Sequence, residues 1–135
     1  MILHEHYEQV NLFRWAAMLT PAHPELGLIF AIPNGGHRHI ITAKKLKAEG
    51  VKSGVPDIFL AYPRQGSQWP NAGAAHGLFI ELKKENGGRL SEHQSEWIMK
   101  LNNAGYKCAV CHGWVHAAQE ICDYLGIDRS SVGVK

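Results

Sequence analysis

The sequence predicts an α/β fold in which a mixed sheet is flanked by helices. Segments with helical spacing of apolar residues alternate with short apolar runs, and turn residues separate them in the order αβαββαβα. With 135 residues, 45% of them hydrophobic and 19% charged, the chain suits one globular domain. We expect that domain to cover residues 1–135, with a core over about residues 3–126 and a tail over residues 127–135.

The N-terminal part predicts one helix and one strand. Apolar side chains spaced three and four residues apart predict a helix that begins near Leu3 and ends before Pro21. The apolar run at residues 26–32 predicts a buried strand, which the turn residues 33–36 close.

The middle of the chain predicts a second helix and two further strands. The helix covers about residues 40–49 and ends at Gly50, and the strands cover residues 57–62 and 77–83. Residues 63–76 between them are rich in Pro and Gly and are predicted to form a long loop.

The last third predicts helix, strand and helix. Ser91 and Gln94 have the spacing of a capping box, which opens a helix that ends at Gly105. Residues 106–111 are predicted to form a strand and residues 115–125 the last helix.

Two carboxylates and an ammonium are predicted to meet at the ends of two strands. Glu81 and Lys83 are two residues apart, so they leave the same sheet face about 6 to 7 Å apart, while Leu82 faces the core. If the two strands pair antiparallel, Asp57 lies opposite the Glu81 end of its neighbour. Such oxygen ligands suit Mg²⁺ or Mn²⁺. The alternative is a solvated ion pair beside an ordinary turn residue.

The surroundings of this pattern contain several short segments in a fixed order. They are Glu8 in the first helix, IPNGGHR (32–38), GVKSGVPD (50–57), FIELK (79–83), LSEHQ (90–94) and AGY (104–106). In these segments the chain resembles the VRR-NUC family of the PD-(D/E)XK nuclease superfamily over roughly residues 7–111. The resemblance implies a restriction-endonuclease-like fold and a metal-dependent nuclease that acts on DNA.

The resemblance also implies roles for individual residues. Asp57, Glu81 and the backbone carbonyl of Leu82 would bind Mg²⁺ or Mn²⁺, and Lys83 would position the water nucleophile. Glu8 would reach the metal site from the first helix and Gln94 from the third. For Glu8 the alternative is a solvated residue beside the apolar stripe, and for Gln94 it is a purely structural capping residue.

A basic stripe indicates a surface for DNA phosphates, although the net charge is only +2. It contains one acidic residue, Glu49, and five basic residues: Arg38, Lys44, Lys45, Lys47 and Lys52. Asn34 and Gly35 are expected to form a tight turn near a phosphate. The alternatives are the wet face of an amphipathic helix for the stripe and a structural turn for the two residues.

The cysteine pattern argues against a disulfide framework. Three cysteines form an odd set, and Cys108 with Cys111, His112 and His116 has poor spacing for zinc. We therefore expect a soluble, intracellular, cytoplasmic protein. The apolar run at residues 26–33 is too short to cross a membrane.

The leading hypothesis is an endonuclease that hydrolyses phosphodiester bonds in DNA. A two-fold homodimer with a preference for branched DNA, such as four-way junctions, would supply paired cuts from a chain with one site. Two alternatives stay open: a non-catalytic DNA-binding or assembly module of the same fold, and an RNA-processing nuclease.

Overall fold

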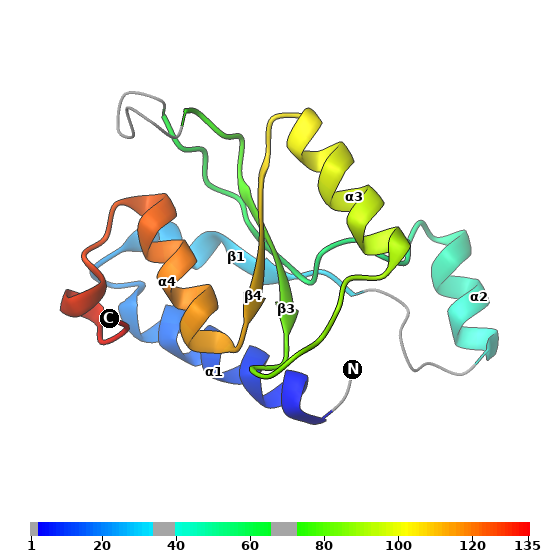
Figure 1. Cartoon of the computed structure of the whole chain (residues 1–135), viewed down its shortest axis with the longest axis horizontal. Helices are drawn as coiled ribbons and strands as arrows, with labels where there is room; N and C mark the ends of the chain where they lie inside the picture. Colours follow the sequence, from blue (N-terminus) through cyan, green and yellow to red (C-terminus); the bar gives the residue numbers. More distant parts are fainter. Residues whose placement is uncertain (1–2, 34–39, 66–72) are drawn as a thin grey trace.

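The computed structural model describes residues 3–33, 40–65 and 73–135, and its main elements follow the predicted order αβαββαβα (Figure 1). The elements are α1 (Leu3–Leu19), the 3₁₀ helix η1 (Pro24–Leu28), β1 (Ile29–Ala31), α2 (Ile40–Ala48), β2 (Ile58–Leu60), β3 (Leu78–Lys83), α3 (Glu92–Asn103), β4 (Lys107–His112), α4 (Trp114–Leu125) and the 3₁₀ helix η3 (Arg129–Val132).

The sheet is mixed, as the sequence predicts. Its strand order is β1-β2-β3-β4. β2 pairs antiparallel with both β1 and β3, whereas β3 and β4 are parallel. The parallel pair needs a crossover, which α3 provides. The β2–β3 register aligns Ile58 with Ile80, so Asp57, which precedes β2, reaches the end of β3 where Glu81 lies.

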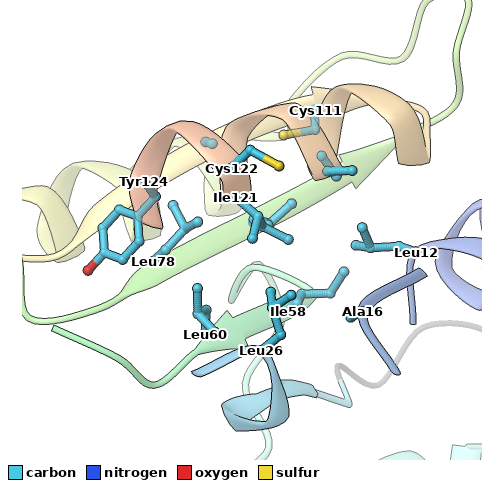
Figure 2. Packing of buried hydrophobic residues seen from close by; sticks show 14 of the residues in the cluster. Leu12, Ala16, Leu26, Ile58, Leu60, Leu78, Cys111, Ile121, Cys122 and Tyr124 are labelled. Atoms are coloured by element: carbon cyan, nitrogen blue, oxygen red, sulfur yellow. The ribbon is translucent and has the colours of Figure 1, made fainter. Parts of the chain in front are cut away.

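The hydrophobic core lies between one sheet face and the helices α1 and α4 (Figure 2). Leu78, Ile80 and Leu82 alternate along β3 and are all buried on this face. Leu12 from α1 and Ile121 from α4 complete the cluster and are fully buried. The intervening β3 residues Glu81 and Lys83 consequently leave the opposite face, toward α3.

The prediction of a buried strand over residues 26–32 is wrong. Residues up to Leu28 form η1, which has Pro24 at its start, and only Ile29–Ala31 form a strand. β1 is at the edge of the sheet, and Phe30 is 48% exposed. An apolar run alone cannot separate a short strand from a short helical turn that buries a single residue, here Leu26.

The hydrophobic core extends beyond residue 126, the end expected for it. Val134 is 2% exposed, and the carbonyl of Val132 accepts a hydrogen bond of 3.1 Å from the Trp15 indole. The last residues therefore pack against α1 instead of forming a loose tail. In the described ranges, no helix combines the length and the hydropathy that crossing a membrane requires.

Candidate active site

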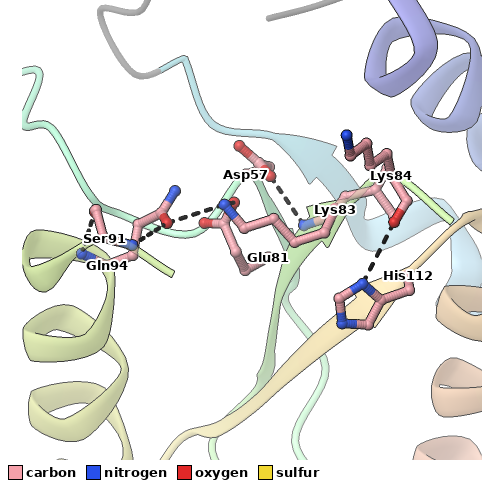
Figure 3. Close-up of polar contacts among 8 residues, drawn as sticks. Asp57, Glu81, Lys83, Lys84, Ser91, Gln94 and His112 are labelled. Carbon is pink, nitrogen blue, oxygen red and sulfur yellow. Dashed lines mark hydrogen bonds and ion pairs between the residues drawn. The ribbon is translucent and has the colours of Figure 1, made fainter. Parts of the chain in front are cut away.

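Asp57 is anchored beside the end of β3 (Figure 3). Its Oδ2 atom accepts a hydrogen bond of 2.9 Å from the backbone N–H of Leu82. The antiparallel pairing of β2 with β3 stops at Ile58. Beyond that point, the Asp57 carboxylate replaces a backbone carbonyl of β2 as the acceptor for the Leu82 N–H. The Asp57 carboxylate is thereby held next to Glu81, as the sequence pattern predicts for paired strands.

Lys83 connects the carboxylates to α3. Its Nζ atom lies 3.8 Å from Glu81 Oε2 and donates a hydrogen bond of 3.0 Å to Gln94 Oε1. Lys83 is only 9% exposed, so its side chain is held in place by its surroundings. The structure thus brings Asp57, Glu81, Lys83 and Gln94 together at one place.

The Glu81 carboxyl group is in an unfavourable environment for a charge. It is 2% exposed, and burial together with the adjacent Asp57 carboxylate raises the pKa of Glu81 from 4.5 to about 9. Lys83 acts in the opposite direction but does not cancel these effects. In the described part of the chain, Glu81 Oε1 is buried without a hydrogen-bond partner. A cation placed beside Glu81 would relieve both problems.

Gln94 serves as a helix cap and as a partner of Lys83 at the same time. The Ser91 hydroxyl accepts a hydrogen bond of 3.2 Å from the Gln94 N–H, and Gln94 Oε1 accepts one of 2.9 Å from the Ser91 N–H. This is the predicted capping box. Because the same Oε1 atom also accepts from Lys83, the two uses of Gln94 that the sequence left as alternatives are compatible.

Glu8 makes a contact that the sequence does not predict for it. Its Oε2 atom accepts a hydrogen bond of 2.6 Å from the backbone N–H of Trp114, at the start of α4. Gly113, the N-cap residue, has no side chain with which to cap this helix, and a Cβ atom there would lie 2.7 Å from Glu8 Oε2. Glu8 therefore caps α4 from a distant segment and is not simply a solvated residue. Its expected role as a metal ligand stays a prediction.

Glu5, which the sequence motifs do not single out, is a second α1 carboxylate whose charge is felt at the site. Its charge contributes to the raised pKa of Glu81. Glu5 and Glu8 are three residues apart and share one helix face, so spacing could have suggested both. How closely each of them approaches the site depends on where α1 sits along the sheet, and the sequence pattern does not contain that information.

The predicted basic stripe is only partly described. Lys44, Lys45, Lys47 and Lys52 are all exposed, on α2 and on the loop that follows it. Arg38, Asn34 and Gly35 lie outside the described residues.

The Cys and His residues near β4 are engaged in local contacts. The backbone N–H of His112 donates a hydrogen bond of 3.0 Å to His116 Nδ1. Burial raises the pKa of the Cys111 thiol to about 12. In the described ranges, no three or more His, Cys, Asp or Glu residues are grouped to hold a metal ion. A cation beside Asp57 and Glu81 would accordingly need ligands from backbone, water or substrate as well.

Comparison with known proteins identifies the family. A model of the VRR-NUC domain matches residues 2–114, which is most of the chain. The chain belongs to the VRR-NUC family. A solved VRR-NUC domain protein is 27% identical to it, with a TM-score of 0.71 over 94% of this chain and 92% of that chain. No curated protein matches. Membership in the VRR-NUC family indicates a nuclease-type function in DNA processing.

Proposed function

We propose that this VRR-NUC protein is an endonuclease that hydrolyses phosphodiester bonds in DNA with Mg²⁺ or Mn²⁺. The observation that carries the proposal is the position of Glu81, which is buried between the Asp57 carboxylate and the Lys83 ammonium with one oxygen unpartnered. Such an arrangement destabilises a protein that only binds DNA, whereas a metal-dependent nuclease needs it.

The residues at the site fit a hard divalent cation. The unpartnered Glu81 Oε1 and the Asp57 carboxylate offer oxygen ligands, which Mg²⁺ takes in small numbers while it keeps water and substrate phosphate. The backbone carbonyl of Leu82 is a third candidate. Since the N–H and C=O of one strand residue leave the same strand edge, the N–H bond to Asp57 orients this carbonyl toward the same side. When bound, the metal would activate water and stabilise negative charge on the phosphate.

Lys83 contributes a positive charge fixed in place. Its ammonium group is held by Gln94 Oε1 and Glu81 Oε2, which leaves donor capacity for a water or a phosphate oxygen. A preorganised charge of this kind offsets the negative charge that grows during phosphodiester hydrolysis. Gln94 acts as the positioning residue for Lys83.

The site argues against a non-catalytic module. A surface that only binds DNA gains affinity from cations facing phosphates, and two adjacent carboxylates would weaken it. An RNA-processing nuclease remains the second candidate. A protein distinguishes RNA from DNA by contacts to the ribose 2′-hydroxyl group, and Asp57, Glu81 and Lys83 do not identify such a contact.

Substrate shape and assembly are further parts of the proposal. One described catalytic cluster per chain cuts one strand per encounter, and a two-fold homodimer would supply the two cuts that a four-way junction needs. Exposed apolar residues on α2 or on α4, the last helix, are the candidates for the dimer surface. Among the described residues of those helices, Val115 on α4 is an exposed large apolar side chain, and Tyr7 and Met18 on α1 are exposed as well.

One assay tests these points together. Purified protein is incubated with linear duplex, flapped DNA, four-way-junction DNA and single-stranded RNA, each with Mg²⁺, Mn²⁺ or EDTA. We expect cleavage of DNA with either metal, none in EDTA, and the fastest turnover on the junction. Equal rates on linear and junction DNA, or sedimentation of a 15.0 kDa species alone, would contradict the branched-DNA and dimer parts. Absence of metal-dependent DNA cleavage would contradict the whole proposal.

A further inference from the structure

A groove of about 800 Å³ separates α2 from the N-terminal half of α3. In Figure 1, α2 stands beside that end of α3 and away from the sheet. Leu46, Val51 and Trp97 give the groove an apolar lining. Lys47 and Lys52 also line the groove, and both residues are exposed. The groove is therefore a mixed surface, apolar inside and positively charged along one side.

The groove is built from two of the segments that contribute to the candidate active site, the loop before β2 and the start of α3. Its loop residues 51–53 lead directly to Asp57, and its helix residue His93 immediately precedes Gln94. Gly54 holds these segments together: it has a φ of +88°, and a Cβ atom there would lie 2.7 Å from the His93 Cβ. A ligand in the groove would therefore contact segments that adjoin the candidate active site along the chain.

We propose that this groove binds an unpaired nucleotide of the DNA substrate adjacent to the phosphate that is cut. The base stacks on Trp97 in the apolar part of the groove, and its flanking phosphates contact Lys47 and Lys52. The inference rests on the proposed function and deepens it, because it names DNA with an unpaired segment beside the cleavage position as the preferred substrate.

Chemistry and size both favour an unpaired nucleotide as the occupant. Pockets that bind small ligands typically measure about 300–1,000 Å³, which matches the groove. A flat base can cover an aromatic side chain and present its phosphates to lysines, whereas a paired base keeps both faces inside the helical stack. The charge is complementary, since the described residues that line the groove include Lys47 and Lys52 and no acidic side chain.

DNA binding in EDTA tests the inference without interference from cleavage. Fluorescence anisotropy would compare a fully paired duplex with the same duplex carrying a short unpaired flap. The variants are Trp97→Ala, Trp97→Phe and, as the matched control, Met99→Ala. Met99 is on the same helix, is 57% exposed and does not line the groove. Circular dichroism would show that each variant is folded.

We expect Trp97→Ala to weaken binding of the flapped DNA about 5- to 100-fold and to leave duplex binding nearly unchanged. Trp97→Phe keeps an aromatic face and should retain most of the affinity, and Met99→Ala should match the wild type. Lys47→Ala and Lys52→Ala should weaken binding and lower its dependence on salt.

Three outcomes would overturn the inference. If Trp97→Ala binds both DNAs like the wild type, or loses affinity for both equally, the groove does not hold an unpaired base. If Trp97→Ala instead converts a sedimenting dimer to a monomer with unchanged DNA selectivity, the occupant is a second copy of the chain. If Trp97→Ala does not fold, flap binding by Lys47→Ala and Lys52→Ala that equals the wild type is the contradicting result. A wild-type protein that binds no DNA would overturn the proposed function itself, whereas the first two outcomes leave that function standing.

Discussion

The side-chain oxygen of Gln94 lies 3.0 Å from the ammonium nitrogen of Lys83. This contact connects the first turn of α3 to the end of β3. The loop of residues 84–91 joins these two elements along the chain. The same oxygen closes the capping box with Ser91. A feature that stabilises a helix start therefore also sets the position of the one buried cation beside Glu81 in the described structure.

The double use of Gln94 predicts different outcomes for two neighbouring substitutions. Ser91→Ala removes the hydroxyl that accepts from the Gln94 N–H, so it should lower the free energy of unfolding by about 0.5–2 kcal/mol and leave cleavage nearly unchanged. Gln94→Ala should cost a similar amount of stability and also slow cleavage, because Lys83 loses its acceptor. Urea unfolding and single-turnover cleavage measure the two effects. If Gln94→Ala cleaves DNA as fast as Ser91→Ala and the wild type, Gln94 is only a helix cap.

The two α1 carboxylates are expected to separate function from stability. Glu8→Ala removes the acceptor for the Trp114 N–H, so unfolding should become easier by about 1–3 kcal/mol while the metal dependence of cleavage is kept. Glu5→Gln should leave stability nearly intact and change the metal concentration needed for cleavage, because Glu5 adds to the negative charge around Glu81. Urea unfolding and metal titrations of cleavage by both variants measure the two effects, with Glu96→Gln as an exposed control. The reverse assignment of effects would support the predicted role of Glu8 as a metal ligand.

The raised pKa of Glu81 predicts a pH-dependent stability in the absence of divalent cations. In the folded protein this pKa is about 9, above its ordinary value of 4.5, so folded Glu81 holds a proton that the unfolded chain releases. Its stabilising contribution is complete below pH 4.5 and is lost as the pH rises toward 9. Urea titrations in EDTA across this window should show wild type losing stability relative to Glu81→Gln. Parallel pH profiles for the two proteins would mean that Glu81 is charged throughout.

Much of the fold could be predicted from the sequence because local signals agree with tertiary packing. The capping box at Ser91 and the glycine after α4 mark helix ends whatever surrounds them. Strand alternation places Leu82 in the core and Glu81 with Lys83 on the other face. The meeting of Asp57 with Glu81 follows once the two strands are taken as antiparallel neighbours.

The remaining features depend on packing between distant segments. Leu26 is buried and Phe30 exposed, although both belong to one apolar run, because β1 is at the sheet edge. Val134 enters the core without any periodic pattern around it. The pairing of Glu8 with the N–H of Trp114 depends on the axial position of α1, which neither spacing nor composition encodes.

The most direct test of the central claim is cleavage of labelled DNA by Asp57→Ala, Glu81→Ala and Lys83→Ala beside the wild type, in Mg²⁺, with DNA binding measured in EDTA. We expect each folded variant to lose cleavage by at least about 100-fold while it still binds DNA, because the catalytic groups and the phosphate contacts are separate. Asp57→Ala and Glu81→Ala should bind DNA at least as tightly as the wild type. Wild-type cleavage by any one of these three folded variants would contradict the assignment of the site.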